Sequence, residues 1–218
     1  MSTIKKSGRP SINNNKRGKL IIAAKKLFVI YDYDKVSIRA IATEAGVDSA
    51  LIRYYFQSKL GLFTAMVQQT AEPVVAQFDK QLNALSPDSA HELMTTYYQV
   101  MSQNPDFPKL IFKIASMQEN EHSQVLKKIL SDVLNPKNVK LFSLMKQQGL
   151  LQDHVDPLCM QISFFSMMVF PFLMPEFFKQ VLQLDITPEF MTHLALQNQQ
   201  LLQHGCIKPA TTETKDIS

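Results

Sequence analysis

The sequence is poor in the residues that build metal, disulfide and nucleotide sites. Its two cysteines, Cys159 and Cys206, are far apart and lack the close spacing of a zinc knuckle, so we expect two reduced thiols in a cytoplasmic protein. Glycine occurs only six times, and there is no glycine-rich phosphate loop and no GxSxG, HExxH or CxxC motif. The five histidines are scattered without a partner at ligand spacing. The sequence therefore predicts no enzyme activity, no metal and no cofactor.

Apolar runs long enough to cross a bilayer are also missing. The richest run, residues 164–174, contains Pro171 and is shorter than the roughly 20 residues that a transmembrane helix needs. The basic N-terminus is not followed by the apolar segment of a secretion signal. We therefore expect no membrane contact.

Positive charge is abundant but unevenly distributed. Residues 1–60 carry eight lysines and four arginines against four acidic residues, a net charge of +8, whereas the remainder has eleven basic and fifteen acidic residues, a net charge of −4. All the arginines lie in the first part. Because arginine pairs well with phosphate and guanine edges, this segregation marks residues 1–60 as the part that faces a polyanion. A small domain that merely happens to be basic is the alternative.

Two short amphipathic helices meet at a tight turn within residues 36–59. Ser37 is placed to cap the first helix, which runs to about residue 45 and is closed by Gly46. Asp48 is placed to cap the second, which runs through Phe56. Only about two residues separate the two helices, so the pattern predicts a helix-turn-helix.

The second helix has a core side and an outer side. Helical geometry turns Ile52 and Phe56 inward. The outer side, which is small at its start and basic and aromatic beyond, suits entry into a major groove. Its residues are Ser49, Ala50, Arg53 and Tyr54.

Two cations stand where the helix dipole disfavours them. Arg39 lies in a first helical turn and Lys59 opens the next helix, at a cost of about 0.3–1 kcal/mol each when exposed. A phosphate bound at each helix terminus would reverse the sign of that effect. We therefore expect phosphate contacts at both positions, with a tolerated surface cation as the alternative for either one alone.

Several short motifs between Leu20 and Met66 occur together: AAKKLF, Tyr33, SIRAIATEAGV, DSALIRYYFQSK and LF. In this combination they resemble the TetR family of bacterial transcription regulators. The resemblance implies an all-α fold, with a three-helix DNA-binding head on a larger helical ligand-binding and dimerisation body. It also implies no catalysis, and usually repression that a small molecule relieves.

Carried over by position, the resemblance implies phosphate contacts by Ser37, Arg39, Tyr55 and Lys59, and base contacts by Ser49, Arg53 and Tyr54. Three features depart from the family pattern. Asp32 replaces a usual glycine and is expected to adopt the left-handed conformation. Leu51 replaces a small hydroxyl residue beside the DNA face, where it could favour a thymine methyl. Leu60 and Gly61 replace an acidic pair, so we expect a weakly capped helix there.

We predict four segments. Residues 1–13 form a disordered basic arm whose Lys5, Lys6 and Arg9 reach phosphate or the minor groove, or else a solvated tail. Residues 14–58 are the DNA-binding domain, 59–204 the ligand-binding and dimerisation domain, and 205–218 a disordered tail. Outside the motif we expect a helix over 15–31 and a long helix after Ser58 that Pro73 kinks or interrupts. Further helices are expected over 73–85, 89–104, 108–116, 121–134, 136–148, 157–170, 176–183 and 188–203.

The body is rich in methionine and phenylalanine with few polar groups among them, which is the usual composition of a small-molecule site. Plain core packing is the alternative for any single residue. The candidate ligand residues are Met94, Tyr97, Tyr98, Met101, Phe112, Met117, Gln161, Phe164, Phe165 and Met168.

The last two long helices carry apolar residues that could pair with their copies in a homodimer. Intramolecular packing is the alternative. A two-fold dimer places its recognition helices about 34–36 Å apart and therefore requires a palindromic operator. The candidate dimer residues are Ile162, Phe165, Met168, Val169, Phe190, Leu194 and Leu201.

The sequence thus predicts a nucleoid-associated transcriptional regulator, a repressor that an apolar small molecule releases from a palindromic operator on double-stranded DNA. One alternative is an architectural or division-linked DNA-binding protein with a protein partner and no inducer. The other alternative is an enzyme that uses the apolar body as a substrate pocket, but such an enzyme would need clustered titratable groups that the sequence does not display.

Overall fold

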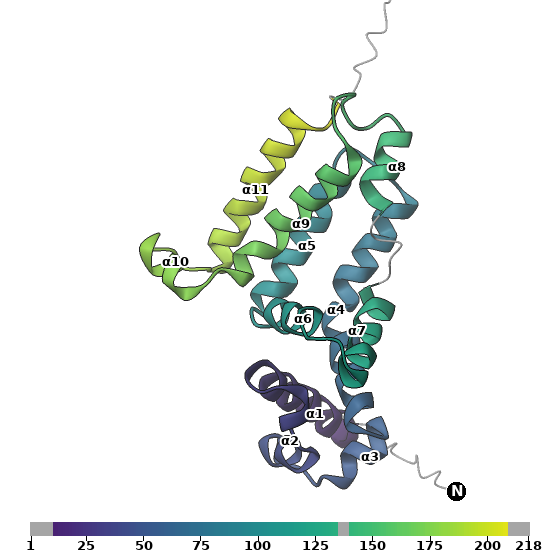
Figure 1. The fold of residues 1–218 in the computed structure, drawn as a ribbon, viewed down its shortest axis with the longest axis vertical. Coiled ribbons are helices and arrows are strands. Elements are labelled where there is room, and N and C mark those ends of the chain that lie inside the picture. The colour runs from purple at the N-terminus through teal and green to yellow at the C-terminus, as the bar shows by residue number, and fades with distance from the viewer. Residues whose placement is uncertain (1–10, 135–139, 209–218) are drawn as a thin grey trace, which may run out of the picture. The chain divides into compact units, whose positions relative to one another are not determined.

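The computed structural model describes residues 11–134 and 140–208. Within these residues the chain is helical, and the only strand-like pairing is one antiparallel bridge between Leu151 and Ile207. The predicted all-α fold is therefore confirmed (Figure 1). The chain divides into two compact units, a head up to Gln69 and a body from Thr70 onward.

The head is built on three helices. They are α1 (Ser11–Ile30), α2 (Ile38–Ala45) and α3 (Ala50–Phe56), with a short 3₁₀ turn, η1 (Tyr33–Lys35), between the first two. Helix α1 packs against both α2 and α3. Most residues that the helical spacing turns inward are buried, among them Leu20, Phe28, Ile41 and Ile52. Tyr31 and Ile38, at helix ends, are exposed, so their expected place on the inward faces is wrong. Burial of these side chains is the main source of stability in a domain this small.

Helix α4 (Lys59–Asn83) begins in the head and ends in the body. Of the two expectations for Pro73, a kink or an interruption, the interruption is wrong, because α4 continues through this residue. Proline has no N–H, so the carbonyl of Gln69 lacks its normal partner four residues on. The two units divide between Gln69 and Thr70, within α4 and at this missing hydrogen bond.

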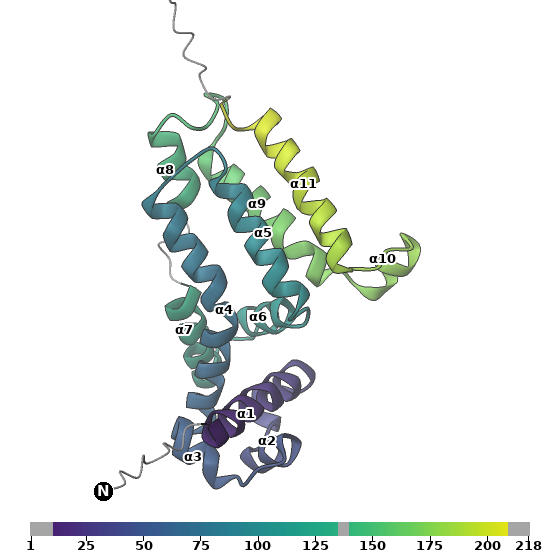
Figure 2. The same cartoon turned by 180° about the vertical axis from the view of Figure 1, so that it is seen from behind.

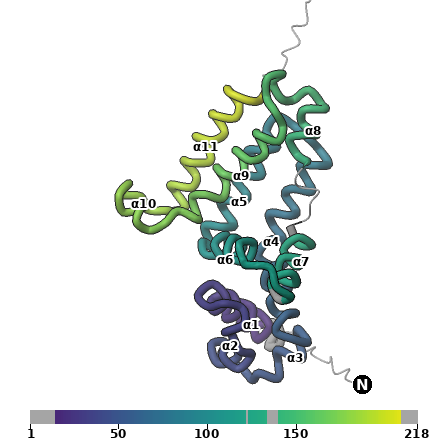
Figure 3. Tube along the Cα trace, in the orientation of Figure 1, coloured from purple at the N-terminus to yellow at the C-terminus, as the bar shows by residue number. Residues whose placement is uncertain are grey.

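The body continues with shorter helices. They are α5 (Ser89–Ser102), α6 (Phe107–Ala115), α7 (Glu121–Leu134), α8 (Leu141–Gln147), α9 (Pro157–Leu173), α10 (Glu176–Val181) and α11 (Pro188–Gly205). Helix α5 packs against both α9 and α11, and α9 also packs against α6 and α8 (Figure 2). Helix α10 joins α9 to α11 and projects from them (Figure 3).

The predictions of disorder are wrong for residues 11–13 and 205–208, which the structure describes. Residues 11–13 belong to α1, and residues 1–10 lie outside the described part. Gly205 ends α11 and Ile207 is buried against Leu151, with the amide of Gln152 donating to the carbonyl of Cys206 at 2.9 Å. Residues 205–208 are thus held in the fold, and residues 209–218 lie outside the described part.

Two other features concern long helices. Helix α9 continues past Pro171 to Leu173, three residues beyond its expected end at 170. Among the described residues, no helix combines the length and the apolar character needed to cross a membrane.

Candidate nucleic-acid interface and body sites

The two motif helices are capped by the predicted residues. The Ser37 hydroxyl accepts a hydrogen bond from the amide of Ala40 at 3.0 Å, and Gly46 ends α2 in the left-handed conformation with φ 63°. The Asp48 carboxylate accepts from the amide of Ala50 at 2.7 Å. The connection is longer than expected, because residues 46–49 all lie between the helices rather than about two. These caps fix where each helix begins and therefore which side chains face outward.

Helix α3 presents the predicted outer face, with one exception. Ile52 and Phe56 are buried, whereas Arg53 and Tyr54 are exposed, Tyr54 to 71%. Ala50 is also exposed and leaves space beside these side chains. Ser49 is half-buried, since its position on the helix lies close to the direction of Phe56. The outer face is therefore formed by Ala50, Arg53 and Tyr54.

The arginines of the motif are available to a polyanion. Arg39 at the start of α2 and Arg53 on α3 are exposed, and neither forms an ion pair with any described residue. Two lysines of the head differ, since Lys26 pairs with Glu44 at 2.6 Å and Lys35 with Asp32 at 3.1 Å.

Lys59 has partners inside the head. Its ammonium donates to the backbone carbonyls of Tyr33 at 2.9 Å and Val36 at 3.0 Å, and lies 4.2 Å from the centre of the Tyr33 ring. Burial lowers the pKa of this lysine, and the nearby Asp34 carboxylate opposes part of that shift. The carbonyl groups of Tyr33, which opens η1, and of Val36, which follows it, therefore supply the negative potential for which a phosphate was expected.

Sequence reasoning missed this contact because the partners are more than twenty positions apart. Tyr33 stacks on Phe28 at 5.4 Å and meets the edge of Phe63 at 5.5 Å, so η1 is fastened to α1 and α4. Burial, and then the charge of Asp34, raise the pKa of Tyr33. A tyrosine that follows the first helix was visible in the sequence, but its contact with Lys59 was not.

The junction between α3 and α4 requires a glycine. A Cβ atom on Gly61 would lie 2.0 Å from the carbonyl oxygen of Phe56. The expectation of a weakly capped helix is wrong, because the Ser58 hydroxyl accepts from the amide of Gly61 at 3.0 Å. Gln57 between the helices has a positive φ of 68°.

Two other departures from the family pattern have structural outcomes. Asp32 has an extended backbone with φ −64° and ψ 147°, so the predicted left-handed conformation is wrong. The chain leaves α1 through η1 instead. Leu51 is half-buried beside the outer face of α3.

Most candidate ligand residues lie in the core of the body. Tyr97 and Tyr98 of α5 contact the Phe172 ring of α9, with ring centres 5.9 and 6.1 Å apart. Met94, Met101, Gln161, Phe164 and Met168 are also buried, whereas Met117 and Phe165 are half-buried. Phe112 is 58% exposed, so its expected place in a buried apolar site is wrong, because its position on α6 faces solvent rather than α9.

Burial affects the chemistry of the two tyrosines. It raises the pKa of Tyr97 strongly and that of Tyr98 to about 12. The Tyr98 hydroxyl donates to the Met167 carbonyl at 2.7 Å and accepts from the Asn198 amide at 3.1 Å. Tyr98 of α5 thereby links α9 to α11.

Gln161 is the exceptional polar residue of this core. It is 3% exposed, and neither its amide nitrogen nor its amide oxygen has a hydrogen-bond partner among the described residues. Buried amides are nearly always paired with protein, water or a ligand.

The candidate dimer residues fall into two groups. Ile162 and Leu201 are more than half exposed, and Phe165, Val169, Phe190 and Leu194 are half-buried. Met168 is 2% exposed and belongs to the core of its own chain, so its assignment to a surface stripe is wrong. Leu158, which the sequence reasoning missed, is 65% exposed and continues the α9 stripe one turn before Ile162.

Comparisons with known proteins agree with this architecture. The model of the bacterial regulatory proteins of the tetR family matches residues 20–66. The probable HTH-type transcriptional regulator YttP of Bacillus subtilis is 25% identical over 175 residues, which cover 78% of this chain and 83% of that protein. The HTH-type transcriptional activator FasR of Mycolicibacterium smegmatis is 35% identical over 63 residues, 29% of each chain.

Likeness of fold extends over nearly the whole chain. The structure of the fatty acid degradation regulator FadR from Bacillus halodurans has a TM-score of 0.62 at 19% identity, and covers 92% of this chain and 98% of that one. The family match falls on the head whose capped helices carry the exposed Arg53 and Tyr54. Together these findings place residues 20–66 in the tetR family of bacterial regulatory proteins and show that the chain shares its fold with solved transcription regulators.

Proposed function

We propose that this protein is a dimeric repressor that an apolar small molecule releases from a palindromic operator. The observation that carries the DNA-binding part is the outer face of α3, where Arg53 and Tyr54 point to solvent while Ile52 and Phe56 hold the helix in the core. A basic and aromatic face on a short, capped helix fits a major groove.

Each interface residue has a distinct role in this proposal. Arg53 and Tyr54 face base edges. The small Ala50 side chain lets α3 approach the DNA closely, and Ser49 lies at the edge of the interface. Ser37, Arg39 and Tyr55 contact phosphate, where the free amides and dipole of α2 add to the charge of Arg39. Lys59 acts indirectly, since its two carbonyl contacts hold η1 against the start of α4.

Operator binding tests this assignment. The operator is first selected from random duplexes with the full-length protein, and affinities are then measured by mobility shift at several salt concentrations. Arg53→Ala should weaken operator binding by about 1–3 kcal/mol and relax the base preference. Arg39→Ala should weaken binding to operator and random duplex alike. It should also reduce the slope of log affinity against log salt by about 0.9, the value for one phosphate contact. Equal losses on both duplexes for the two variants would contradict these roles.

The dimer is proposed from the apolar stripes on α9 and α11. Leu158, Ile162, Phe165 and Val169 follow the spacing of one helix face, and Phe190, Leu194 and Leu201 do the same on α11. Two such stripes and their copies would form a four-helix interface with two-fold symmetry. Two-fold symmetry in turn requires a palindromic operator. A dimer on the operator can repress by blocking access to it, without any further contact surface.

The ligand is proposed to enter the body core around Gln161. Met94, Met101, Phe164 and Met168 are also buried in the body, and methionine-rich cores adapt to irregular apolar ligands. The unpaired amide of Gln161 would satisfy one polar group of the ligand. The Bacillus halodurans protein of the same fold regulates fatty acid degradation, which makes fatty acyl compounds the first class to examine.

Release is tested on the operator complex with fatty acids of eight to eighteen carbons and their thioesters. A compound of this class should dissociate the complex, and Gln161→Leu should weaken its effect while leaving operator affinity unchanged. Gln118→Leu, on an exposed glutamine between α6 and α7, is the matched control. Release that is unchanged in Gln161→Leu would exclude this ligand site.

A further inference from the structure

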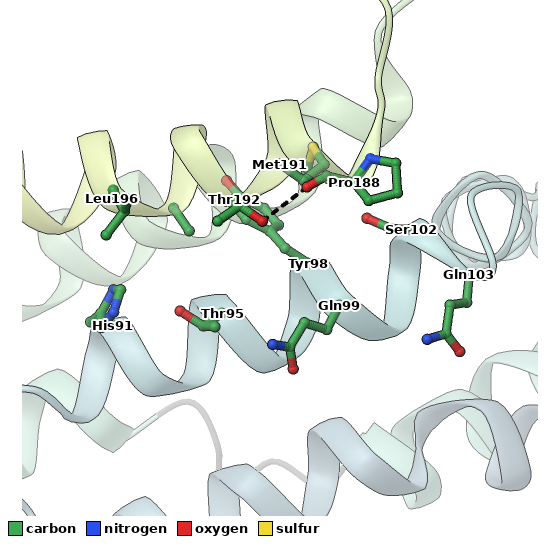
Figure 4. Close-up of a pocket in the computed structure, with 11 residues that line it drawn as sticks. His91, Thr95, Tyr98, Gln99, Ser102, Gln103, Pro188, Met191, Thr192 and Leu196 are labelled. Atoms are coloured by element: carbon green, nitrogen blue, oxygen red, sulfur yellow. Dashed lines mark hydrogen bonds between the residues drawn. The ribbon is translucent and has the colours of Figure 1, made fainter.

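A pocket of about 320 Å³ lies between α5 and α11. Gln161 does not line it, and of the candidate ligand residues only Tyr98 does. One wall is a polar face of α5 that contains His91, Thr95 and Ser102. The other wall is the largely apolar face of α11, formed by Met191, Ala195 and Leu196 (Figure 4).

Three polar atoms in the α5 wall are buried and have no hydrogen-bond partner among the described residues. They are Nδ1 of His91, Oγ1 of Thr95 and Oγ of Ser102. All three side chains lie on the side of α5 that faces α11 (Figure 4). They follow one helix face over roughly 16 Å. Native proteins pair almost all buried polar atoms, so three unpaired atoms in one pocket wall indicate a place for a partner.

Two neighbouring polar groups in the same pocket, the hydroxyls of Tyr98 and Thr192, are already paired. The Tyr98 hydroxyl bonds to Met167 and Asn198, as described above. The Thr192 hydroxyl donates to the Pro188 carbonyl at 3.0 Å (Figure 4). The unused hydrogen-bonding capacity is therefore concentrated on α5, opposite the apolar wall.

The lining also restricts the charge of a ligand. It contains no lysine, arginine, aspartate or glutamate, so no permanently charged side chain there compensates a carboxylate, a phosphate or an ammonium group. Serine and threonine hydroxyls both donate and accept, and an imidazole nitrogen does either according to its tautomer. Hydroxyl groups of a ligand have the same dual capacity.

We propose that the pocket between α5 and α11 binds a small uncharged polyol or sugar, whose hydroxyl groups pair with His91, Thr95 and Ser102 and whose less polar face packs on Met191 and Leu196. Rotation about χ1 turns the Thr95 and Ser102 hydroxyls toward the pocket that both residues line. This site is independent of DNA binding and of the apolar ligand proposed for the core.

The test is direct binding to the full-length protein without DNA. Saturation-transfer NMR is recorded with three neutral probes, myo-inositol, trehalose and N-acetylglucosamine. At least one probe should bind saturably. The double variant Thr95→Val with Ser102→Ala, which removes the two hydroxyls at nearly constant volume, should raise its dissociation constant about tenfold or more. Thr96→Val, the same change one residue along α5 and outside the pocket lining, should bind as the wild type does.

Thermal stability separates ligand binding from a structural role. If the hydroxyls await a ligand, their removal leaves the Tm of the free protein unchanged or raises it, because unpaired buried groups are lost. Ser102→Ala alone serves if the double variant does not fold. The proposal is overturned if no neutral probe binds, if binding survives the loss of the hydroxyls, or if the hydroxyl-free variants have a lower Tm while Thr96→Val does not. Because DNA is absent, failure here leaves the proposed repressor function intact.

Discussion

Replacement of Lys59 by methionine separates two roles for this lysine. Lys59→Met keeps most of the apolar stem but removes the ammonium that bonds to the carbonyls of Tyr33 and Val36 at 2.9 and 3.0 Å. Each charge-assisted hydrogen bond contributes about 1.5–3 kcal/mol before desolvation, and the cation–π contact with Tyr33 adds about 0.5–1 kcal/mol. Burial of the charge opposes these gains, as the lowered pKa of Lys59 indicates. We therefore expect a net loss of about 1.5–3 kcal/mol.

The assay is thermal unfolding followed by the helical circular dichroism signal, combined with DNA binding at several salt concentrations. For a chain of this size the expected loss lowers the Tm by roughly 3–12 °C. Lys35→Met is the matched control, because the Lys35 side chain is 74% exposed and its ion pair with Asp32 contributes at most about 1 kcal/mol. Well below the Tm, Lys59→Met should retain the wild-type salt dependence of operator binding.

The opposite pattern would refute the reasoning. If Lys59 held a phosphate, its loss would leave the Tm unchanged and reduce the slope of log affinity against log salt by about 0.9. That result would mean that the carbonyl contacts contribute nothing to stability and that the first expectation for Lys59 was right.

Three further predictions concern the α3–α4 junction, a buried tyrosine and the dimer. Gly61→Ala should destabilise the head by about 1–3 kcal/mol in urea unfolding, because the added Cβ would clash with the Phe56 carbonyl. Gly18→Ala is the control and should be neutral or stabilising, because a Cβ there would have no atom within 4 Å. The pKa of Tyr98 is raised from 10 to about 12, so the neutral hydroxyl contributes up to about 2 kcal/mol to the free energy of unfolding. This contribution is complete below pH 10 and is lost as the pH rises through 12. Tyr98→Phe should therefore make the free energy of unfolding depend less on pH between 10 and 12. The double variant Ile162→Arg with Leu201→Arg should sediment as a monomer and bind the operator more weakly. An equally exposed charge introduced on α7 should have neither effect. A dimer that persists in the double variant would place the interface elsewhere.

The sequence alone determined the local structure of the head. Ser37, Gly46 and Asp48 have side chains or backbone freedom that act within a few residues, so their capping roles could be read directly and are confirmed. The periodicity that buries Ile52 beneath α3 is equally local. The same local signals predicted the all-α body and most of its helix starts, many of them at proline.

Contacts between distant parts of the chain were decided only by the tertiary structure. Lys59 finds its carbonyl partners more than twenty residues away, so its charge looked unpaired in the sequence. Pro73 was expected to kink or interrupt a helix, and α4 continues through it, because the packing of the flanking turns outweighs the missing hydrogen bond. Composition could not say that Phe112 faces solvent or that Met168 belongs to the core. The pocket between α5 and α11 is likewise made by two helices that lie about a hundred residues apart along the chain, as the Asn198–Tyr98 bond illustrates, and no sequence pattern records which of their faces meet.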